Sequence, residues 1–419
     1  MTRPPSVPVK NTQAKETVLI YGWTVVIVSF FIAILAYGGI YSFGIFFKSL
    51  QEDLGWSAAA TSGVFSLYLL SYCFFSIFSG WAVDRLGPKI IISLGGFFIG
   101  LGFLLASNVY RLWHIYFCYG LFIGIGISAV YAPLLATTSR WVEKRRGLAL
   151  GIVSSGIGAG NVFVPLLASY LISQYGWRTS YIIMGSLAGG GITILAVLYL
   201  KKDPPLKKYV QKNAEPNNKT GTCIFESYSI RKIFLFEAFW LLALVYLMVG
   251  FGLQMMIVHI VPHIVKVFRT SQIIAAGVFS IMGASSIAGR LLMGAISDII
   301  GRKSVLIICV LLEGIAILTL INTLNDYALY LFAVLFGFGF GGHNPQFPAL
   351  TGELFGLAKM GSIIGLHLIF YGISGAFGSF LAGSVLDRTG SYYNAFGLAG
   401  IAMLLAAAFS LKIKRPQLC

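Results

Sequence analysis

The sequence predicts an all-α membrane protein with twelve transmembrane helices arranged as two six-helix bundles. Three observations lead to this prediction. The 419-residue chain is 57% hydrophobic and 11% charged, with a mean hydropathy of +0.84, whereas a soluble globular protein carries about 25% charged residues. Apolar runs long enough to cross about 30 Å of hydrocarbon follow one another along the chain. One long polar segment near the middle divides these runs into two sets of six.

The apolar runs are separated by short loops, apart from that central segment. The first six occupy residues 18–46, 58–83, 89–107, 112–137, 146–174 and 178–200. The second six occupy residues 234–264, 271–298, 303–322, 327–350, 359–386 and 392–413. We therefore expect a tail at 1–17, a bundle at 18–200, a basic linker at 201–232, a second bundle at 233–413 and a tail at 414–419.

The formal net charge of +16 is distributed unevenly between the two sides of the predicted bundle. With the amino terminus in the cytoplasm, twenty-three of the thirty lysines and arginines fall in cytoplasmic segments and six on the opposite side. Cytoplasmic loops of membrane proteins carry this excess of positive charge. We expect a multi-pass protein of the cell membrane with both termini cytoplasmic, whose basic charge faces the lipid bilayer and not a nucleic acid.

The residues that enzyme or cofactor chemistry needs do not cluster in the sequence. The five cysteines are scattered without metal or disulfide spacing (Cys73, Cys118, Cys223, Cys309 and Cys419). The glycine run Gly337–Gly342 lies in an apolar span and follows no strand, which excludes dinucleotide binding. The sequence predicts no enzyme, cofactor or metal site, and it gives no sign of an obligate protein partner.

Arg290 lies inside the apolar run 271–298 and carries a permanent charge. An arginine at the centre of a bilayer costs about 3 kcal/mol even on the mildest scale. Ser286 and Gly294, one turn before and after, supply no acid. A buried cation without a partner in its own helix favours an anionic substrate as its partner. The alternatives are an arginine that extends toward the lipid headgroups and one that pairs with an acid elsewhere in the protein.

A repeat connects the ends of the second and eighth predicted spans. The stretch Gly80–Lys89 contains Asp84, Arg85 and Gly87, and the stretch Gly294–Lys303 repeats the acid and the glycine as Asp298 and Gly301. An acid at a helix end, a tight glycine turn and following cations suit ion pairs that form and break as the two halves move. The sequence predicts a cytoplasmic latch made of Asp84, Arg85, Asp298, Arg302 and Lys303; the alternative, which is compatible with it, is a simple clamp of the loops.

The motif Gly-x-x-x-Asp-Arg-x-Gly-Pro-Lys in the first copy of this repeat resembles the signature loop of the major facilitator superfamily. Two further stretches resemble monocarboxylate porters within it: Tyr21-Gly22-Trp23, and Arg140–Gly151 running into Ser155–Gly160. Oxalate–formate exchangers share much of the second stretch. The resemblance implies a major facilitator fold over the whole chain, and it implies that Arg290 pairs with the substrate carboxylate.

The chain departs from these families at three charged positions. Ser286 replaces the acid of proton-coupled animal members, Tyr41 stands at their first-helix lysine, and Tyr371 stands at the eleventh-helix lysine of oxalate exchangers. One fixed cation balances a monocarboxylate better than a dicarboxylate. We therefore expect a transporter of small monocarboxylates of the lactate or pyruvate type. The alternatives are an oxalate–formate-type anion exchanger and a drug or sugar porter of the same fold.

Several polar residues lie on the spans that the resemblance assigns to the central path. Tyr119, Tyr131, Tyr371, Asn161 and Asn344 join Arg290 and Tyr41 as expected substrate contacts. Proton symport is the expected coupling, with H⁺ as the second partner, although anion exchange stays open. His259 and His367 are the expected proton carriers because histidine changes its charge near neutral pH. Glu313 also lies inside a span, but on a peripheral helix where we expect no coupling role.

Overall fold

The computed structural model describes residues 9–56, 58–201, 230–269, 272–321 and 326–414. All regular secondary structure in these ranges is helical, and they contain no strand. The linker residues 202–229, the tail residues 1–8 and 415–419, and residues 57, 270–271 and 322–325 lie outside the described part of the chain. The predicted linker and the predicted C-terminal tail therefore fall largely outside it, and the predicted N-terminal tail falls outside it in part.

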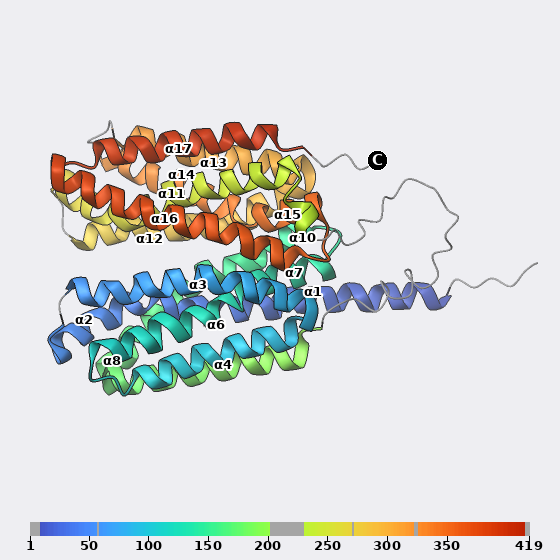
Figure 1. The fold of residues 1–419 in the computed structure, drawn as a ribbon, viewed down its shortest axis with the longest axis horizontal. Helices are drawn as coiled ribbons and strands as arrows, with labels where there is room; N and C mark the ends of the chain where they lie inside the picture. Colours follow the sequence, from blue (N-terminus) through green and yellow to red (C-terminus); the bar gives the residue numbers. More distant parts are fainter. Residues whose placement is uncertain (1–8, 57, 202–229, 270–271, 322–325, 415–419) are drawn as a thin grey trace, which may run out of the picture.

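The N-terminal half consists of nine helical elements that form one layer of the molecule (Figure 1). They are α1 (Val9–Tyr41), α2 (Phe43–Leu54), α3 (Ala58–Leu86), α4 (Pro88–Ala106), α5 (Leu112–Ile115), the π-helix η1 (Tyr116–Ile123), α6 (Gly124–Ser128), α7 (Tyr131–Trp141) and α8 (Arg146–Tyr199). Helix α1 begins within the predicted tail and its first turns project beyond the layer (Figure 1).

The C-terminal half forms the second layer. Its elements are α10 (Ile230–Ile233), α11 (Glu237–Val267), α12 (Gln272–Ile300), α13 (Arg302–Leu320), α14 (Asp326–His343), α15 (Gln346–Phe355), α16 (Met360–Thr389) and α17 (Tyr393–Lys412). Figure 1 shows this layer lying along the first, with the helices of both layers running in the same general direction.

Ten helical segments of the described chain are long and apolar enough to cross a membrane. One of them, α8, has 54 residues, more than twice the roughly 20 that a bilayer needs. It turns back at Gly176, whose φ of 75° an L side chain rarely adopts, so α8 supplies two spans. Helices α14 and α15 together supply one more. The fold therefore has twelve spans, as the sequence predicts.

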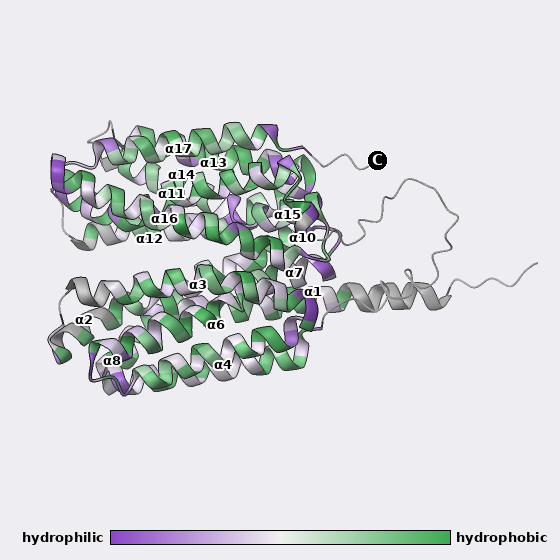
Figure 2. Ribbon diagram, in the orientation of Figure 1, coloured by the Kyte–Doolittle hydropathy of each residue, from purple (hydrophilic) through white to green (hydrophobic). Residues whose placement is uncertain are grey.

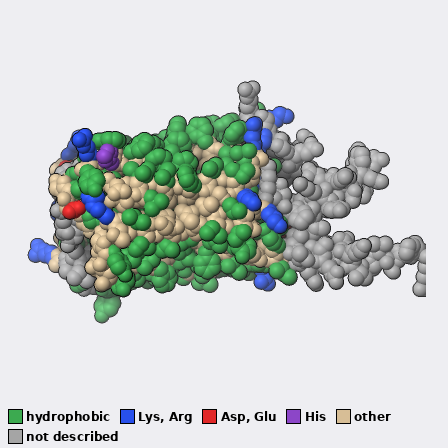
Figure 3. Space-filling model, turned by 90° about the horizontal axis from the view of Figure 1, so that it is seen from below, with side chains coloured by type: hydrophobic (Ala, Val, Ile, Leu, Met, Phe, Trp, Pro, Cys, Tyr) green, Lys and Arg blue, Asp and Glu red, His purple; other side chains and the backbone are tan. Residues whose placement is uncertain are grey.

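The outer surface of the bundle is apolar along its length and charged at its ends. Figure 2 shows hydrophobic residues along the helices and hydrophilic ones gathered at the two ends, and Figure 3 shows the same pattern on one face. Large apolar side chains such as Phe74, Phe163 and Leu166 are more than half exposed. An exposed apolar surface of this extent is the surface that lipid covers in a membrane protein.

The two layers contact each other through small residues on two helix pairs, α8 with α12 and α3 with α16. A Cβ added at Gly151 of α8 would collide with the carbonyl oxygen of Arg290, and one at Gly80 of α3 would collide with that of Gly361. Small residues allow membrane helices to approach this closely. These contacts hold the backbone of Arg290 against the opposite half.

Candidate functional site

Arg290 is buried at the interface between the two halves, with 2% of its surface exposed. Its Nη1 donates a hydrogen bond to Ser286 Oγ at 2.6 Å, and its Cζ lies 5.0 Å from the centre of the Phe340 ring. Its Nε is buried without a hydrogen-bond partner. No acidic side chain of the described residues forms a salt bridge with it. The guanidinium therefore neither reaches the outer surface nor meets an acid in the described chain.

Two cavities meet at Arg290. The larger has a volume of about 200 Å³ and the smaller about 50 Å³, and Tyr41, Ile157 and Phe340 border both. Their walls come from helices of both layers. Gly158 of α8 faces the guanidinium so closely that an added Cβ would stand 3.2 Å from Nη1. The site is thus a cavity shared by the two halves, with one buried cation on its wall.

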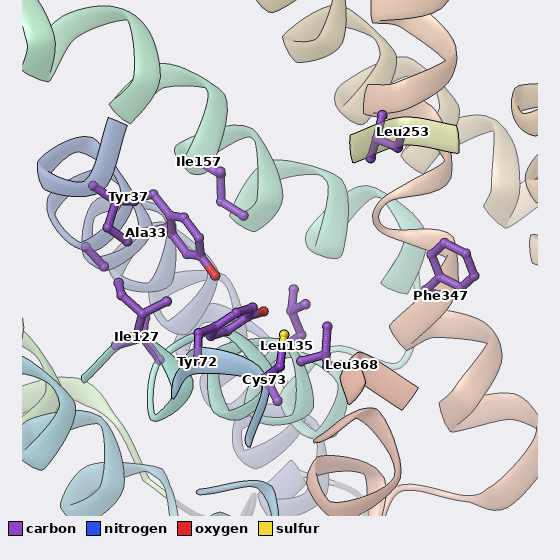
Figure 4. Close-up of a cluster of buried hydrophobic side chains, with 14 of the residues drawn as sticks. Ala33, Tyr37, Tyr72, Cys73, Ile127, Leu135, Ile157, Leu253, Phe347 and Leu368 are labelled. Carbon is purple, nitrogen blue, oxygen red and sulfur yellow. The ribbon is translucent and has the colours of Figure 1, made fainter. Parts of the chain in front are cut away.

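Tyrosines dominate the wall of the larger cavity. The structure brings the expected residues Tyr41, Tyr131 and Tyr371 to this wall, and it adds four that sequence reasoning missed: Tyr37, Tyr68, Tyr72 and Tyr246. In Figure 4 the rings of Tyr37 and Tyr72 extend from different helices with their hydroxyls directed into the same space. The four-residue spacing of Tyr68 and Tyr72 places them on one helix face. That spacing is the signal that could have identified them.

Hydrogen bonds connect polar side chains on the wall of the larger cavity. Tyr131 from the N-terminal half donates to Asn344 Oδ1 at 2.9 Å, between α14 and α15. Gln254 Nε2 donates to the Tyr371 hydroxyl at 3.3 Å. Tyr41 and Tyr131 lie close enough to interact electrostatically with Arg290. The cavity therefore offers hydroxyl and amide groups next to the positive charge.

Asn161 borders the smaller cavity together with Ser286 and Arg290. It comes from α8, on the opposite half from the other two. The smaller cavity therefore has an amide side chain on its wall, and Asn161 stays a predicted substrate contact.

Tyr119 lies outside both cavities. Its ring packs between Phe43 at 4.5 Å and Phe103 at 5.9 Å, and its buried hydroxyl donates to the Ile40 carbonyl at 3.1 Å. The structure therefore gives Tyr119 a packing position and not a place on the cavity wall. The sequence could not distinguish it from the other tyrosines because all of them lie on apolar spans.

The two expected proton carriers also lie away from the cavity walls. His367 is fully buried and stacks on Phe239 and Tyr246, with Nε2 3.3 Å from the Phe239 carbonyl oxygen. His259 contacts the Tyr392 hydroxyl at 3.2 Å and the Ser379 carbonyl oxygen at 2.9 Å. The histidine that does border the larger cavity is His343, which the sequence analysis did not select. It is 2.5 Å from Glu313 Oε1 through its Nδ1.

One end of the molecule, where α3 ends and α16 begins, is called the terminal face below. At this face Asp84 of α3 contacts the opposite half. Its carboxylate accepts hydrogen bonds from the Ser362 backbone N–H and hydroxyl, both at 2.8 Å. Arg140 Nη2 lies 2.5 Å from its Oδ1. Arg85 instead stacks on the Trp81 ring at 4.4 Å. Asp84 thus contacts the opposite half, and Arg140, which the sequence analysis did not select, is the arginine that forms its salt bridge.

Asp298 repeats this arrangement on the other helix pair of the terminal face. It accepts the backbone N–H groups of Gly147 and Leu148 at 2.9 and 3.0 Å, at the start of α8. Arg302 Nη2 lies 2.5 Å from Asp298, and its Nε lies 3.1 Å from Glu353. Each acid thus caps the N-terminus of a helix of the opposite half, where the helix dipole favours negative charge.

Lys303 does not take part in this contact. Its Nζ donates to the carbonyl oxygens of Leu411 and Ile413 at 2.7 and 2.9 Å, at the end of α17 within the same half. The glycine turns that follow the two acids are alike, because Gly87 and Gly301 have φ values of 89° and 90°. The repeat in the sequence therefore corresponds to a repeat in backbone conformation, but the cations around it differ.

Within the described ranges, no group of three or more His, Cys, Asp or Glu side chains could hold a metal ion. The cavity instead combines one guanidinium, several hydroxyls and aromatic walls. A guanidinium forms strong, charge-assisted hydrogen bonds with carboxylates. The site is therefore suited to bind a small organic anion.

Comparison with known proteins agrees with this picture. The sequence model described as "Major Facilitator Superfamily" matches residues 29–299 and 242–418. Monocarboxylate transporter 12 of Xenopus laevis is 27% identical over 402 residues, which cover 92% of this chain and 87% of that protein. Monocarboxylate transporter 13 of Rattus norvegicus is 26% identical, with 95% and 92% covered.

Solved structures share the fold at lower sequence identity. The proton:xylose symporter XylE superposes with a TM-score of 0.72 at 16% identity, covering 94% of this chain and 96% of that one. The major facilitator superfamily transporter FucP in its outward conformation gives a TM-score of 0.73 at 14% identity, with 94% of this chain and 99% of that one covered. At these identities the likeness concerns the arrangement of the helices.

Proposed function

The chain belongs to the major facilitator superfamily and is a membrane transporter, and from this premise we propose that it carries small monocarboxylates of the lactate and pyruvate type. The observation that carries the proposal is Arg290, a buried cation on the wall of a cavity between the halves with no acid beside it among the described residues. A substrate carboxylate completes its charge and reduces the cost of burying it.

The size of the cavity supports a small substrate. The larger cavity at Arg290 has a volume of about 200 Å³, below the roughly 300–1,000 Å³ of pockets that take drug-sized ligands. Lactate and pyruvate have six non-hydrogen atoms, whereas a hexose has twelve. The size therefore favours a short organic acid over the sugar or drug cargo of other porters with this fold.

The charge of the cavity supports a single carboxylate. Tyr371 stands on the wall where oxalate exchangers have a second cation by resemblance, and its hydroxyl receives a hydrogen bond from Gln254. Arg290 alone leaves the second carboxylate of oxalate without a matching charge. A methyl or keto end fits better against Phe340 and the tyrosine rings. The proposal therefore prefers monocarboxylates to oxalate.

The transport cycle in this proposal is alternating access by rocking of the two bundles. Asp84 and Asp298, each of which caps a helix of the opposite half, hold the terminal face closed in the present conformation. Substrate on Arg290 lets the halves close around a neutral site, after which the caps separate and the terminal face opens. We further propose that the protein lies in the cell membrane with the terminal face toward the cytoplasm.

Uptake by purified protein in liposomes tests the substrate class. Labelled L-lactate, pyruvate, formate, oxalate and D-glucose are compared at equal concentration, with protein-free liposomes as the background. We expect uptake of lactate and pyruvate above that of oxalate, and none of glucose. Preference for oxalate with formate exchange would favour the anion exchanger, and glucose uptake without lactate uptake would contradict the proposal.

A further inference from the structure

Glu313 and His343 form a buried pair next to the transport cavity. Glu313 on α13 is fully buried and His343 at the end of α14 is 2% exposed, with Oε1 and Nδ1 2.5 Å apart. Glu313 Oε2 is buried without a hydrogen-bond partner in the described structure. A buried carboxyl group with a vacant oxygen is costly when ionised and inexpensive when protonated. The pair therefore has a place for one more proton.

His343 connects this pair to the anion site. It borders the larger cavity, and the centre of its ring lies 5.9 Å from the centre of the Phe340 ring. The Cζ atom of Arg290 lies 5.0 Å from the centre of the same Phe340 ring. Helix α14 packs against both α12, which carries Arg290, and α13, which carries Glu313. A proton bound at the pair and an anion bound at Arg290 thus both lie near the ring of Phe340.

The charges around the pair are few. Cys309 on α13 interacts electrostatically with Glu313. The Phe347 ring contacts both Tyr246 of α11 and His343, and the Phe340 ring contacts both Arg290 of α12 and His343. Opposite the next residue of α13, Gly314, α17 presents Gly400, Met403 and Leu404, which carry no charge. Within the described chain, His343 is the side chain that contacts the Glu313 carboxyl group at hydrogen-bond distance.

Three side chains with a formal charge are buried among the residues whose burial is described: Arg140, Arg290 and Glu313. Asp84 neutralises Arg140. Arg290 and Glu313 remain as one positive and one negative charge on the two sides of α14. With His343 neutral, the charges of Arg290 and Glu313 sum to zero. A zero net charge inside the membrane suits an empty carrier that changes the side to which its site opens.

We propose that Glu313 and His343 are the proton-carrying site of the transport cycle and load one proton for each carboxylate that binds Arg290. The inference rests on the proposed function, because the anion supplies the charge that the proton offsets. In the empty carrier Glu313 is ionised and accepts a hydrogen bond from the neutral His343 Nδ1–H. In the loaded carrier the anion neutralises Arg290 and a proton neutralises Glu313. The buried charge is zero in both states.

The proton transfer needs no other reactant. His343 takes a proton from cavity water at Nε2, the ring nitrogen not engaged with Glu313. The Nδ1–H bond then breaks and an O–H bond forms on Glu313, which leaves a neutral carboxylic acid and a neutral imidazole. Release of the carboxylate on the other side reverses the transfer. One anion and one proton cross together, so transport is electroneutral.

Glu313→Gln tests the proposal because it replaces the carboxyl group with a neutral amide that does not take up or release a proton. The variant is reconstituted and assayed with labelled L-lactate in two ways, by exchange between preloaded liposomes and by uptake against a pH difference. A one-to-one symporter accumulates substrate up to about 100-fold under a gradient of about two pH units. We expect the variant to retain exchange and to lose this accumulation, and His343→Gln to do the same.

Cys309→Ala is the matched control, since it alters the neighbour of Glu313 one turn away and leaves the pair intact. We expect it to retain both exchange and accumulation. A Glu313→Gln protein that still accumulates lactate with the pH gradient overturns the proposal, as does a Cys309→Ala protein that loses accumulation to the same extent. Retained exchange itself shows that a variant is folded.

A measurement on the unaltered protein needs no variant. Purified protein in a weakly buffered detergent solution near pH 7.5 is mixed with L-lactate, and a pH indicator reports proton uptake. We expect about one proton taken up per lactate bound, with none taken up by Glu313→Gln. Lactate binding without proton uptake overturns the proton site and leaves the carboxylate function standing. Failure to bind any carboxylate of the uptake panel removes the proposed function, and the proton site with it.

Discussion

Arg140 and Arg290 are both buried arginines, 5% and 2% exposed, but the structure surrounds them differently. Arg140 at the terminal face meets Asp84 at 2.5 Å and donates from Nε to the Leu357 carbonyl oxygen at 3.2 Å. Arg290 in the cavity meets a serine hydroxyl and the face of an aromatic ring. One cation is neutralised within the chain, whereas the other is left for something that enters the cavity.

This difference separates structural charge from binding charge. A buried ion pair is expensive to break, because removal of either partner leaves an uncompensated charge. Arg140 and Asp84 are such a pair, and they come from the same half and close the terminal face onto Leu357 and Ser362 of the other half. The charge of Arg290 is available to a ligand because no acid of the described chain pairs with it. Substitutions at the two sites should therefore fail in different assays.

The largest effect is expected at Arg290. Arg290→Gln removes the charge and should lower lactate uptake by roughly 30- to 5,000-fold, since loss of a buried charge-assisted bond costs about 2–5 kcal/mol. Arg290→Lys keeps the charge without the two-pronged geometry and should recover only part of the activity. Initial uptake rates in liposomes give the numbers, and Arg388→Gln, an exposed arginine at the end of α16, is the control. Full lactate uptake by Arg290→Gln would contradict the binding role.

Asp84→Asn should act on the conformation and not on the substrate. It leaves Arg140 without its acid, and breaking a buried pair costs about 3–5 kcal/mol. We expect the terminal face to open, which spin labels at Lys89 and Lys412 would register as longer distances in electron double resonance. The exposed Asp387→Asn at the other end of α16 should leave the distances unchanged. Unchanged distances in Asp84→Asn would show that the pair does not hold this face closed.

Asp298→Asn should have the same sign and a smaller size. Arg302 keeps Glu353 at 3.1 Å when Asp298 is neutralised. The Asp298 and Arg302 side chains are also 15% and 14% exposed, compared with 7% and 5% for Asp84 and Arg140. We expect a cost of about 1–2 kcal/mol and a smaller shift in the same spin-label distances. A shift equal to that of Asp84→Asn would mean that the helix caps, and not the arginines, set the stability of this face.

The comparison also shows what could be read from the sequence. Twelve apolar runs predict the spans, and the repeated Gly-x-x-x-Asp turns predict the two acids at helix ends, Asp84 and Asp298. Both patterns are visible in the sequence because hydropathy and backbone conformation are local properties. The partners of those acids come from distant segments. Arg140 lies 56 residues from Asp84, and no local pattern favours it over Arg85. Arg290 was identifiable because a charge in an apolar run is anomalous wherever it falls.

Glu313 is a second residue whose surroundings could not be predicted from the sequence. Its anomaly was visible in the sequence, but its helix was expected to be peripheral and therefore without a role in coupling. The structure adds His343, which no periodicity distinguishes and which extends the influence of that helix to the cavity. Tyr119 was selected for its residue type and lies outside the cavity for a reason of packing alone. Burial and pairing between distant helices are the information that one sequence does not contain.

The smallest expected effect compares two tyrosine hydroxyls. Tyr131→Phe removes the O–H group that donates to Asn344 at 2.9 Å on the cavity wall. Tyr119→Phe removes the one that donates to the Ile40 carbonyl at 3.1 Å away from it. Each bond contributes about 0.5–1.5 kcal/mol, so the losses in thermal stability should be similar. The KM for lactate should rise about two- to tenfold in Tyr131→Phe and stay unchanged in Tyr119→Phe, because Tyr131 borders the cavity and Tyr119 does not. An equal rise in both variants would mean that these hydroxyls act through the packing of the bundle and that the cavity wall does not select the substrate.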